Sequence, residues 1–120
     1  MAGYLTTHVL DVAQGKPAAG VEIELWRLDA GGEGRQFLAR TRTNTEGRTD
    51  TPLIPEGRLE TGTYELVFAV GAYFAGQPVA RAEPQFLDDV PVRFAVADAA
   101  AHYHVPLLVT PWAYSTYRGS

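Results

Sequence analysis

The sequence predicts an all-β protein, an antiparallel β-sandwich with one short helix. Short segments rich in valine, isoleucine, threonine, leucine and tyrosine alternate apolar and polar residues with the period of two that is typical of strands. Clusters of glycine, proline and polar residues separate these segments, as turns do. Because 120 residues is the length of one domain, we expect a single domain over residues 1–120.

Each predicted element follows from this alternation. In the first strand, Tyr4, Thr6, His8 and Leu10 share one face. In the second, residues 21–25, apolar side chains lie on one face and two glutamates on the other. Later strands are predicted at residues 64–70, 92–96, 102–110 and 112–117, the last two joined by a turn at residues 110–111. Turns are predicted at residues 15–17, 30–34, 46–47, 55–57 and 61–62. The single short helix is predicted at residues 71–76, where glycine and proline stop it.

The composition excludes several classes of function. A formal net charge of −4 argues against a nucleic-acid binder, and no basic cluster marks a surface for an anionic membrane. Without cysteine, thiol catalysis and cysteine-bound zinc are excluded. No segment has the roughly 20 consecutive apolar residues of a membrane span, and the amino-terminal residues lack the features of a secretory signal. We therefore expect a cytoplasmic protein that binds neither nucleic acid nor membrane.

The three histidines are the residues best suited to proton transfer near neutral pH. His102 and His104 are two positions apart in a predicted strand, so their side chains project from the same face. They are ordinary hydrogen-bonded strand residues, or they form a three-histidine metal site with His8, or one or two of them form a metal-free acid/base site. Spacing alone does not choose among these interpretations.

Four ordered segments resemble the sequence motifs of the 5-hydroxyisourate hydrolases. Residues 7–11 (THVLD) and the following residues 15–18 (GKPA) are similar to the first motif. Residues 43–48 (TNTEGR) and 102–108 (HYHVPLL) are similar to two others, and residues 114–120 (YSTYRGS) resemble the C-terminal signature. The likeness runs nearly from end to end. The same layout is similar to transthyretin, the hormone carrier with which this family shares its fold.

This resemblance implies a transthyretin-like sandwich and a homotetramer with active sites in a channel at the dimer–dimer interface. It implies hydrolysis of the lactam of 5-hydroxyisourate in urate breakdown, giving 2-oxo-4-hydroxy-4-carboxy-5-ureidoimidazoline without a metal or another cofactor. Where the carrier has lysine, glutamate and two threonines, this chain has His8, Arg48, His104 and Tyr117. The resemblance therefore assigns catalysis to these four residues.

The residue types suit this chemistry. His8 or His104 can take a proton from the attacking water and return one to the leaving nitrogen. Arg48 stays cationic at any working pH, so it can hold the substrate, stabilise an oxyanion and lower the pKa of a nearby imidazole. Tyr117 can donate a hydrogen bond to the substrate. Ser120 can reach the same pocket through its hydroxyl or the terminal carboxylate, so we expect it to bind substrate with Arg48 and Tyr117.

Two other functions remain open at this point. A small-molecule carrier would use the same channel without turnover. A metal-dependent hydrolase would use all three histidines, whereas in the metal-free interpretation His102 has at most a supporting role.

Pro106 is unusual because it removes a backbone donor inside a predicted strand. Proline at such a position normally lies at a sheet edge or in a bulge. We expect it to shape the site if its strand borders the channel, and regular pairing at this residue would contradict that expectation.

Overall fold

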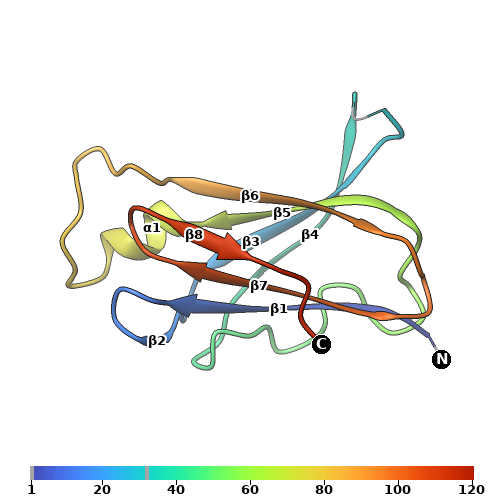
Figure 1. Cartoon of the computed structure of the whole chain (residues 1–120), viewed down its shortest axis with the longest axis horizontal. Coiled ribbons are helices and arrows are strands. Elements are labelled where there is room, and N and C mark those ends of the chain that lie inside the picture. The colour runs from blue at the N-terminus through green and yellow to red at the C-terminus, as the bar shows by residue number, and fades with distance from the viewer. Residues whose placement is uncertain (1, 32) are drawn as a thin grey trace.

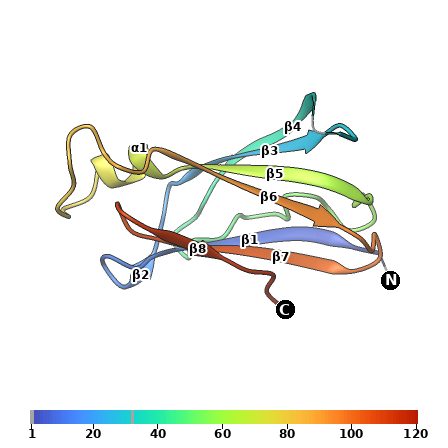
Figure 2. The ribbon, with the colours of Figure 1, turned by 45° about the horizontal axis from the view of Figure 1, so that its top comes forward.

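Two four-stranded sheets pack face to face in the computed structural model of the chain, which describes residues 2–31 and 33–120. In chain order the elements are β1 (Tyr4–Asp11), β2 (Lys16–Pro17), β3 (Glu22–Leu28), β4 (Arg35–Arg42), β5 (Gly62–Ala69), α1 (Val70–Ala75), β6 (Asp89–Val96), β7 (His102–Val109) and β8 (Tyr114–Thr116) (Figure 1). One sheet has the order β2-β1-β7-β8 and the other β4-β3-β5-β6. Figure 2 shows them as two layers with α1 at one end. The predicted sandwich with one short helix is confirmed.

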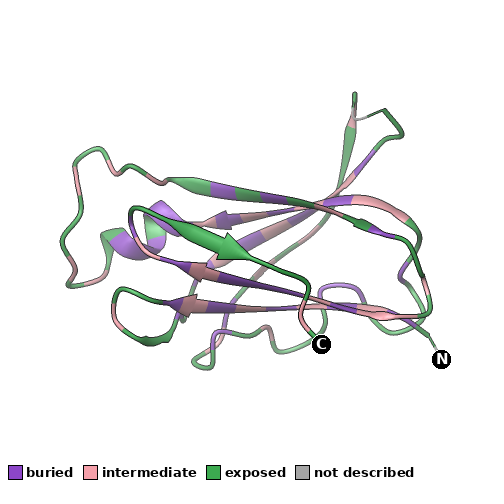
Figure 3. Ribbon diagram, viewed as in Figure 1, coloured by how far each residue is buried: buried purple, intermediate pink, exposed green. Residues whose placement is uncertain are grey.

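The core lies between the sheets because buried residues alternate along the strands. In β1, Leu5, Thr7 and Val9 are buried, whereas the residues that alternate with them, Thr6 and His8, face outward and are half-buried. In β5, Leu66 and Phe68 are buried by the same alternation. Figure 3 shows buried segments along the inner strands and exposed ones on β4 and β8. Each fully buried side chain of this size stabilises the fold by about 1.5–3 kcal/mol.

The structure adds one long strand that the sequence pattern does not predict. β4 pairs with β3 from Arg35 to Arg42 with one bulge at Leu38, but residues 35–38 are all exposed. A strand without a buried face has no apolar alternation, so its pattern gives no signal. Two smaller differences concern turns: residues 16–17 form β2, and the turn predicted at residues 30–34 includes Gly32, which lies outside the described residues.

The pairing of β1 with β7 is parallel, whereas the other strand pairs within the described residues are antiparallel. Its register sets Tyr4 beside His102, Thr6 beside His104 and His8 beside Pro106, without a shift. Side chains of paired residues project from the same face of a sheet. The three histidines therefore share the outer face of this sheet with Thr6.

The expectation that Pro106 lies at an edge or bulge and shapes the site is wrong. β7 is a central strand, and the pairing of Pro106 with His8 continues a regular register. The antiparallel pairing of β7 with β8 begins at the next residue, Leu107. The carbonyl of Pro106 accepts a hydrogen bond from the Thr116 hydroxyl at 2.7 Å. Pairing with β8 does not extend to residue 106. Proline is therefore tolerated here, because no ladder hydrogen bond to β8 needs a backbone N–H at this residue.

The helix begins and ends one residue earlier than predicted. After α1, the backbone N–H of Gly76 donates to the carbonyl of Tyr73 at 3.2 Å and closes the last turn. The Tyr73 hydroxyl donates to Oδ2 of the fully buried Asp11 at 2.7 Å, which joins the helix to the end of β1. In the part of the chain that the structure describes, no helix has the length and apolar character needed to cross a bilayer.

Candidate active site

A pocket of about 410 Å³ opens beside the first half of β1. It is lined by Tyr4, Thr6, Thr7, Arg48, Thr49, Asp50, Thr51, Pro52, His102, His104 and Ser120. Three of the predicted site residues, Arg48, His104 and Ser120, therefore meet in one hollow, although they come from a loop, a strand and the C-terminal tail. Figure 1 shows the C-terminus lying close to β1 and β7.

The parallel pairing of β1 and β7 brings a hydroxyl between two imidazoles. Oγ1 of Thr6 lies 2.6 Å from Nε2 of His102 and 2.8 Å from Nδ1 of His104. The ring of Tyr4 stacks on His102, with centroids 4.0 Å apart and planes 6° from parallel. Both imidazoles are therefore held in defined orientations on the pocket wall.

His104 has the properties of a general base. Burial lowers its pKa below the ordinary histidine value of 6.5, and the charges of Arg48, His102 and His8 lower it further. The imidazole is thus neutral near pH 7, as a base must be. Its Nδ1 is bound to Thr6, whereas within residues 2–31 and 33–120 no hydrogen bond engages its Nε2. Nε2 is therefore the nitrogen available to a substrate or water.

His8 is held more tightly by the backbone. Its Nε2 lies 2.8 Å from the carbonyl oxygen of Glu46, and because a carbonyl only accepts, Nε2 carries the proton. Gly47 allows this contact. Its φ is +77°, and a Cβ there would lie 2.4 Å from the carbonyl oxygen of Val9 and 3.2 Å from the His8 ring. His8 borders the pocket without lining it.

Asn44 builds the loop that carries Arg48. Its Oδ1 accepts the backbone N–H groups of Glu46 at 2.9 Å and Arg48 at 3.2 Å, and its own N–H donates to the Arg48 carbonyl at 2.7 Å. The N–H of Val9 donates to the Gly47 carbonyl at 2.8 Å, which fastens the loop to β1. Arg48 is exposed, and its guanidinium makes no ion pair with any described residue. It is therefore free to bind an anionic or carbonyl-rich ligand.

The C-terminal tail closes the pocket from the other side. The N–H of Gly119 donates to the carbonyl of His104 at 2.7 Å. Arg118 donates to the carbonyl of His102 at 3.2 Å, and its guanidinium lies 4.0 Å above the Tyr103 ring. These contacts carry Ser120 into the pocket.

Tyr117 lies elsewhere in the single chain. It is 60% exposed and lines a separate apolar hollow of about 210 Å³ with Val92, Phe94, Tyr103 and Val105, between β6 and β7. The fold thus gathers Arg48, His104 and Ser120 in one pocket, leaves His8 beside it, and places Tyr117 elsewhere. Sequence reasoning did not assign a role to Tyr4 or Thr6, although both share the face of His8 in the first strand.

The geometry does not resemble a metal centre. The rings of His102 and His104 are 6.0 Å apart, and one nitrogen of each binds the Thr6 hydroxyl. No three His, Cys, Asp or Glu side chains among the described residues are grouped as metal ligands.

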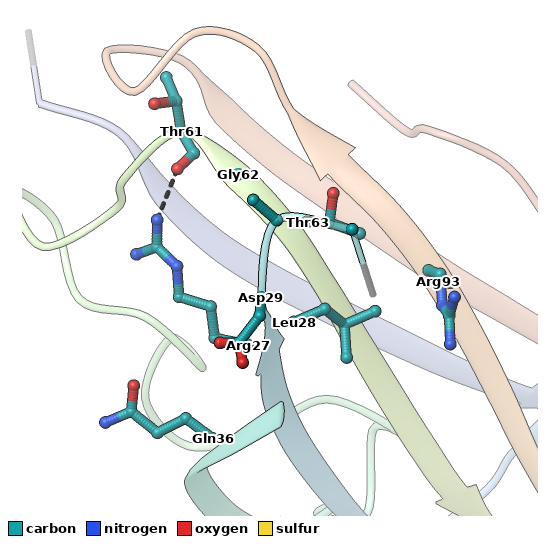
Figure 4. A pocket seen from close by; sticks show the side chains of 10 residues that line it. Arg27, Leu28, Asp29, Gln36, Thr61, Gly62, Thr63 and Arg93 are labelled. Atoms are coloured by element: carbon teal, nitrogen blue, oxygen red, sulfur yellow. Dashed lines mark hydrogen bonds between the residues drawn. The ribbon is translucent and has the colours of Figure 1, made fainter. Parts of the chain in front are cut away.

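A larger hollow of about 700 Å³ lies at one end of the other sheet (Figure 4). Its two cations are already paired, because Arg27 binds Glu60 and the Thr61 carbonyl while Arg93 binds Glu65. No histidine lines it. Among the described residues, its lining therefore offers one carboxylate, Asp29, but no imidazole and no guanidinium without an ion-pair partner.

A β-sandwich that holds, in one pocket, a half-buried imidazole and a guanidinium without an ion-pair partner among the described residues has the groups of an acid/base enzyme. Comparison with known proteins identifies the family. The HIUase/Transthyretin family profile matches residues 5–119, and the chain belongs to this family.

Relatives agree over the whole chain. The 5-hydroxyisourate hydrolase of Deinococcus radiodurans is 57% identical over 122 residues and covers 100% of both chains. The structure of Klebsiella pneumoniae 5-hydroxyisourate hydrolase superposes with a TM-score of 0.77 at 34% identity, over 98% of this chain and 99% of that one. The crystal structure of (S)-allantoin synthase superposes with a TM-score of 0.92 at 42% identity, over 99% of this chain and 44% of the other.

Proposed function

We propose that this chain is an enzyme that hydrolyses 5-hydroxyisourate in urate degradation, by metal-free acid/base catalysis in the pocket of Arg48, His104 and Ser120. The observation that carries the proposal is a half-buried imidazole of lowered pKa, with a free Nε2, in a pocket that also holds an unpaired guanidinium. The Deinococcus radiodurans relative, aligned over its full length at 57% identity, bears the name of this activity.

The groups of the pocket suit each step. Nε2 of His104 takes a proton from water as the water oxygen forms a bond to the lactam carbonyl carbon. Arg48 stabilises the negative charge that develops on the carbonyl oxygen, because its charge is fixed and few protein groups compete for it. The C–N bond then breaks, and the leaving nitrogen takes the proton from the His104 imidazolium. The product is 2-oxo-4-hydroxy-4-carboxy-5-ureidoimidazoline.

The other predicted residues have smaller parts. Ser120 holds the substrate through its hydroxyl or the terminal carboxylate. His8, whose Nε2–H is bound to Glu46, adds a second imidazole beside the pocket and lowers the pKa of His104 if it is protonated. Tyr117 contacts the substrate only in an assembly that brings it to a pocket of this kind, because the single chain does not.

The assembly we propose is a homotetramer with these pockets in a channel between subunits. Support comes from the surface: Phe86, Trp112, Tyr114 and Tyr117 are large and exposed, and three of them lie in or beside β8. Clustered exposed apolar side chains mark contact surfaces. β8 is also the edge of its sheet, with unpaired backbone groups on its outer side.

The test is the decay of 5-hydroxyisourate, generated in place by urate oxidase and followed by near-ultraviolet absorbance. We expect the wild-type protein to accelerate decay and His104→Ala to return it close to the spontaneous rate. Absence of acceleration by the wild-type protein would remove the hydrolase proposal. Hormone binding without turnover would then identify a carrier.

A further inference from the structure

We infer that Thr6 is a positioning residue that sets the tautomer of His104, with His102 orienting the Thr6 hydroxyl. The inference rests on the proposed function, since it concerns the base of that reaction. It adds two residues to the mechanism. Thr6 had no assigned role, and His102 had at most a supporting one.

The Thr6 hydroxyl has one proton and two lone pairs, so it can donate to only one of the two imidazoles that it contacts. It lies 2.6 Å from His102 Nε2 and 2.8 Å from His104 Nδ1. Hydroxyl donors make shorter hydrogen bonds than N–H donors. The two lengths therefore fit a hydroxyl that donates to His102 and accepts from His104.

This direction leaves His104 ready to act as a base. With the proton on Nδ1, the lone pair is on Nε2, the nitrogen without a partner in the described chain. In the opposite direction, Thr6 would donate to Nδ1 and the His104 proton would lie on Nε2. That tautomer cannot take a proton from water at the pocket. The orientation of one hydroxyl thus decides whether the neutral imidazole is a base or a donor.

His102 keeps the hydroxyl in the productive orientation. Its Nε2 must carry a lone pair to accept from Thr6, so its own proton is on Nδ1. Stacking on Tyr4, with planes 6° from parallel, holds the ring in this position. The in-register pairing of Tyr4 with His102 and of Thr6 with His104 makes the arrangement possible.

No net transfer of atoms is involved in this role. When Nε2 takes the proton from water, His104 becomes an imidazolium with both nitrogens protonated. Its Nδ1–H still donates to Thr6, now as a stronger, charge-assisted hydrogen bond. When Nε2 gives its proton to the leaving nitrogen, the starting tautomer is restored.

The direct test is the tautomer of His104, measured by ¹⁵N-detected two-bond correlation spectra of the full protein labelled with ¹⁵N-histidine, above the histidine pKa. We expect Nδ1–H in the wild type. We expect Nε2–H in Thr6→Val, which keeps the side-chain shape but removes the hydroxyl, because isolated imidazole of histidine favours that form. Thr6→Ser restores a hydroxyl, so it should restore Nδ1–H. The matched control is Thr63→Val on the other sheet, with the wild-type tautomer.

His102→Phe gives a second variant that keeps the stack on Tyr4. Here the Thr6 hydroxyl loses its acceptor and donates to His104 instead, so we expect Nε2–H. This variant decides the question even if Thr6→Val does not fold. Wild-type His104 with Nε2–H, or an unchanged tautomer in both variants, would overturn the inference.

The tautomer of His104 should also affect the turnover number. We expect kcat of Thr6→Val and His102→Phe to fall about 10- to 100-fold, by analogy with the loss of groups that orient metal-bound histidines, with Thr6→Ser close to wild type. Because the tautomer is measured without substrate, an inactive wild type that shows Nδ1–H would contradict the proposed function and leave this inference standing. An active wild type with Nε2–H would support the proposed function and overturn this inference.

Discussion

Gly119 lies directly against the ring of His104. Its N–H donates to the His104 carbonyl at 2.7 Å, and a Cβ built on Gly119 would lie 2.6 Å from Cδ2 of that ring. Only a residue without a side chain can bring the C-terminal tail this close. The tail and the proposed base therefore depend on each other for position.

Gly119→Ala is expected to displace the tail or rotate His104. We expect kcat/KM to fall about 10- to 100-fold, because misplacing a catalytic group by about 1 Å costs this much. The matched control is Gly76→Ala, where a Cβ would meet its nearest atom, the Tyr73 carbonyl oxygen, at an ordinary 3.7 Å. Equal activity of the two variants would show that the close contact with His104 is unimportant.

The pH dependence of kcat/KM should follow the neutral form of His104. Burial first, and then the charge of Arg48, lower its pKa from 6.5, so activity should persist below that pH before it falls. Removing the charge in Arg48→Gln should raise the pKa and move the acidic limb to higher pH, besides lowering the rate. Arg48→Lys keeps the charge and should keep the limb in place. A limb at the same pH in both variants would refute this electrostatic link.

Chelation should not impair turnover. After prolonged dialysis against EDTA we expect kcat/KM to equal that of the untreated protein, since the proposed steps use only His104, Arg48 and water. Metal content is measured on the same samples. Loss of activity that zinc restores would favour the three-histidine metal hydrolase instead.

Tyr73→Phe tests the buried contact between the helix and β1. The carboxylate of Asp11 is fully buried and accepts hydrogen bonds from the Tyr73 hydroxyl and from the backbone and side-chain nitrogens of Gln14. Burial, followed by the Asp11 contact, raises the pKa of Tyr73, so the hydroxyl stays a donor at neutral pH. We expect the free energy of unfolding in urea, at fixed protein concentration, to fall by about 1–3 kcal/mol. No change would mean that water replaces the lost donor.

The oligomeric state tests the proposed channel. Sedimentation should give a species of four chains of 13.0 kDa each. Trp112→Lys, which places a charge among exposed aromatic side chains, should shift it to smaller species. If the wild type is a monomer, Tyr117 cannot reach a pocket that holds His104, and Tyr117→Phe should leave kcat unchanged.

Much of the fold could be predicted locally. The outward face of β1, the alternation in β3 and β5, and a short helix that stops before Gly76 could all be predicted from the sequence, because one face of each element is buried. β4 was not predicted, since its exposed residues show no alternation. The predicted strands and β4 differ in burial, because apolar and polar residues alternate in the sequence only where one face of a strand is buried.

The sequence by itself determined the family, the β-sandwich and the residue types of the site, because motif and alternation are properties of short segments. Tertiary structure decided which of those residues meet. The parallel register of β1 and β7 joins residues 98 positions apart and sets Thr6 between His102 and His104. The tertiary structure also places Tyr117 in a separate hollow, away from His104. Pairing between distant strands depends on how the whole chain packs, so no local pattern could have shown that a threonine hydroxyl lies between the two imidazoles.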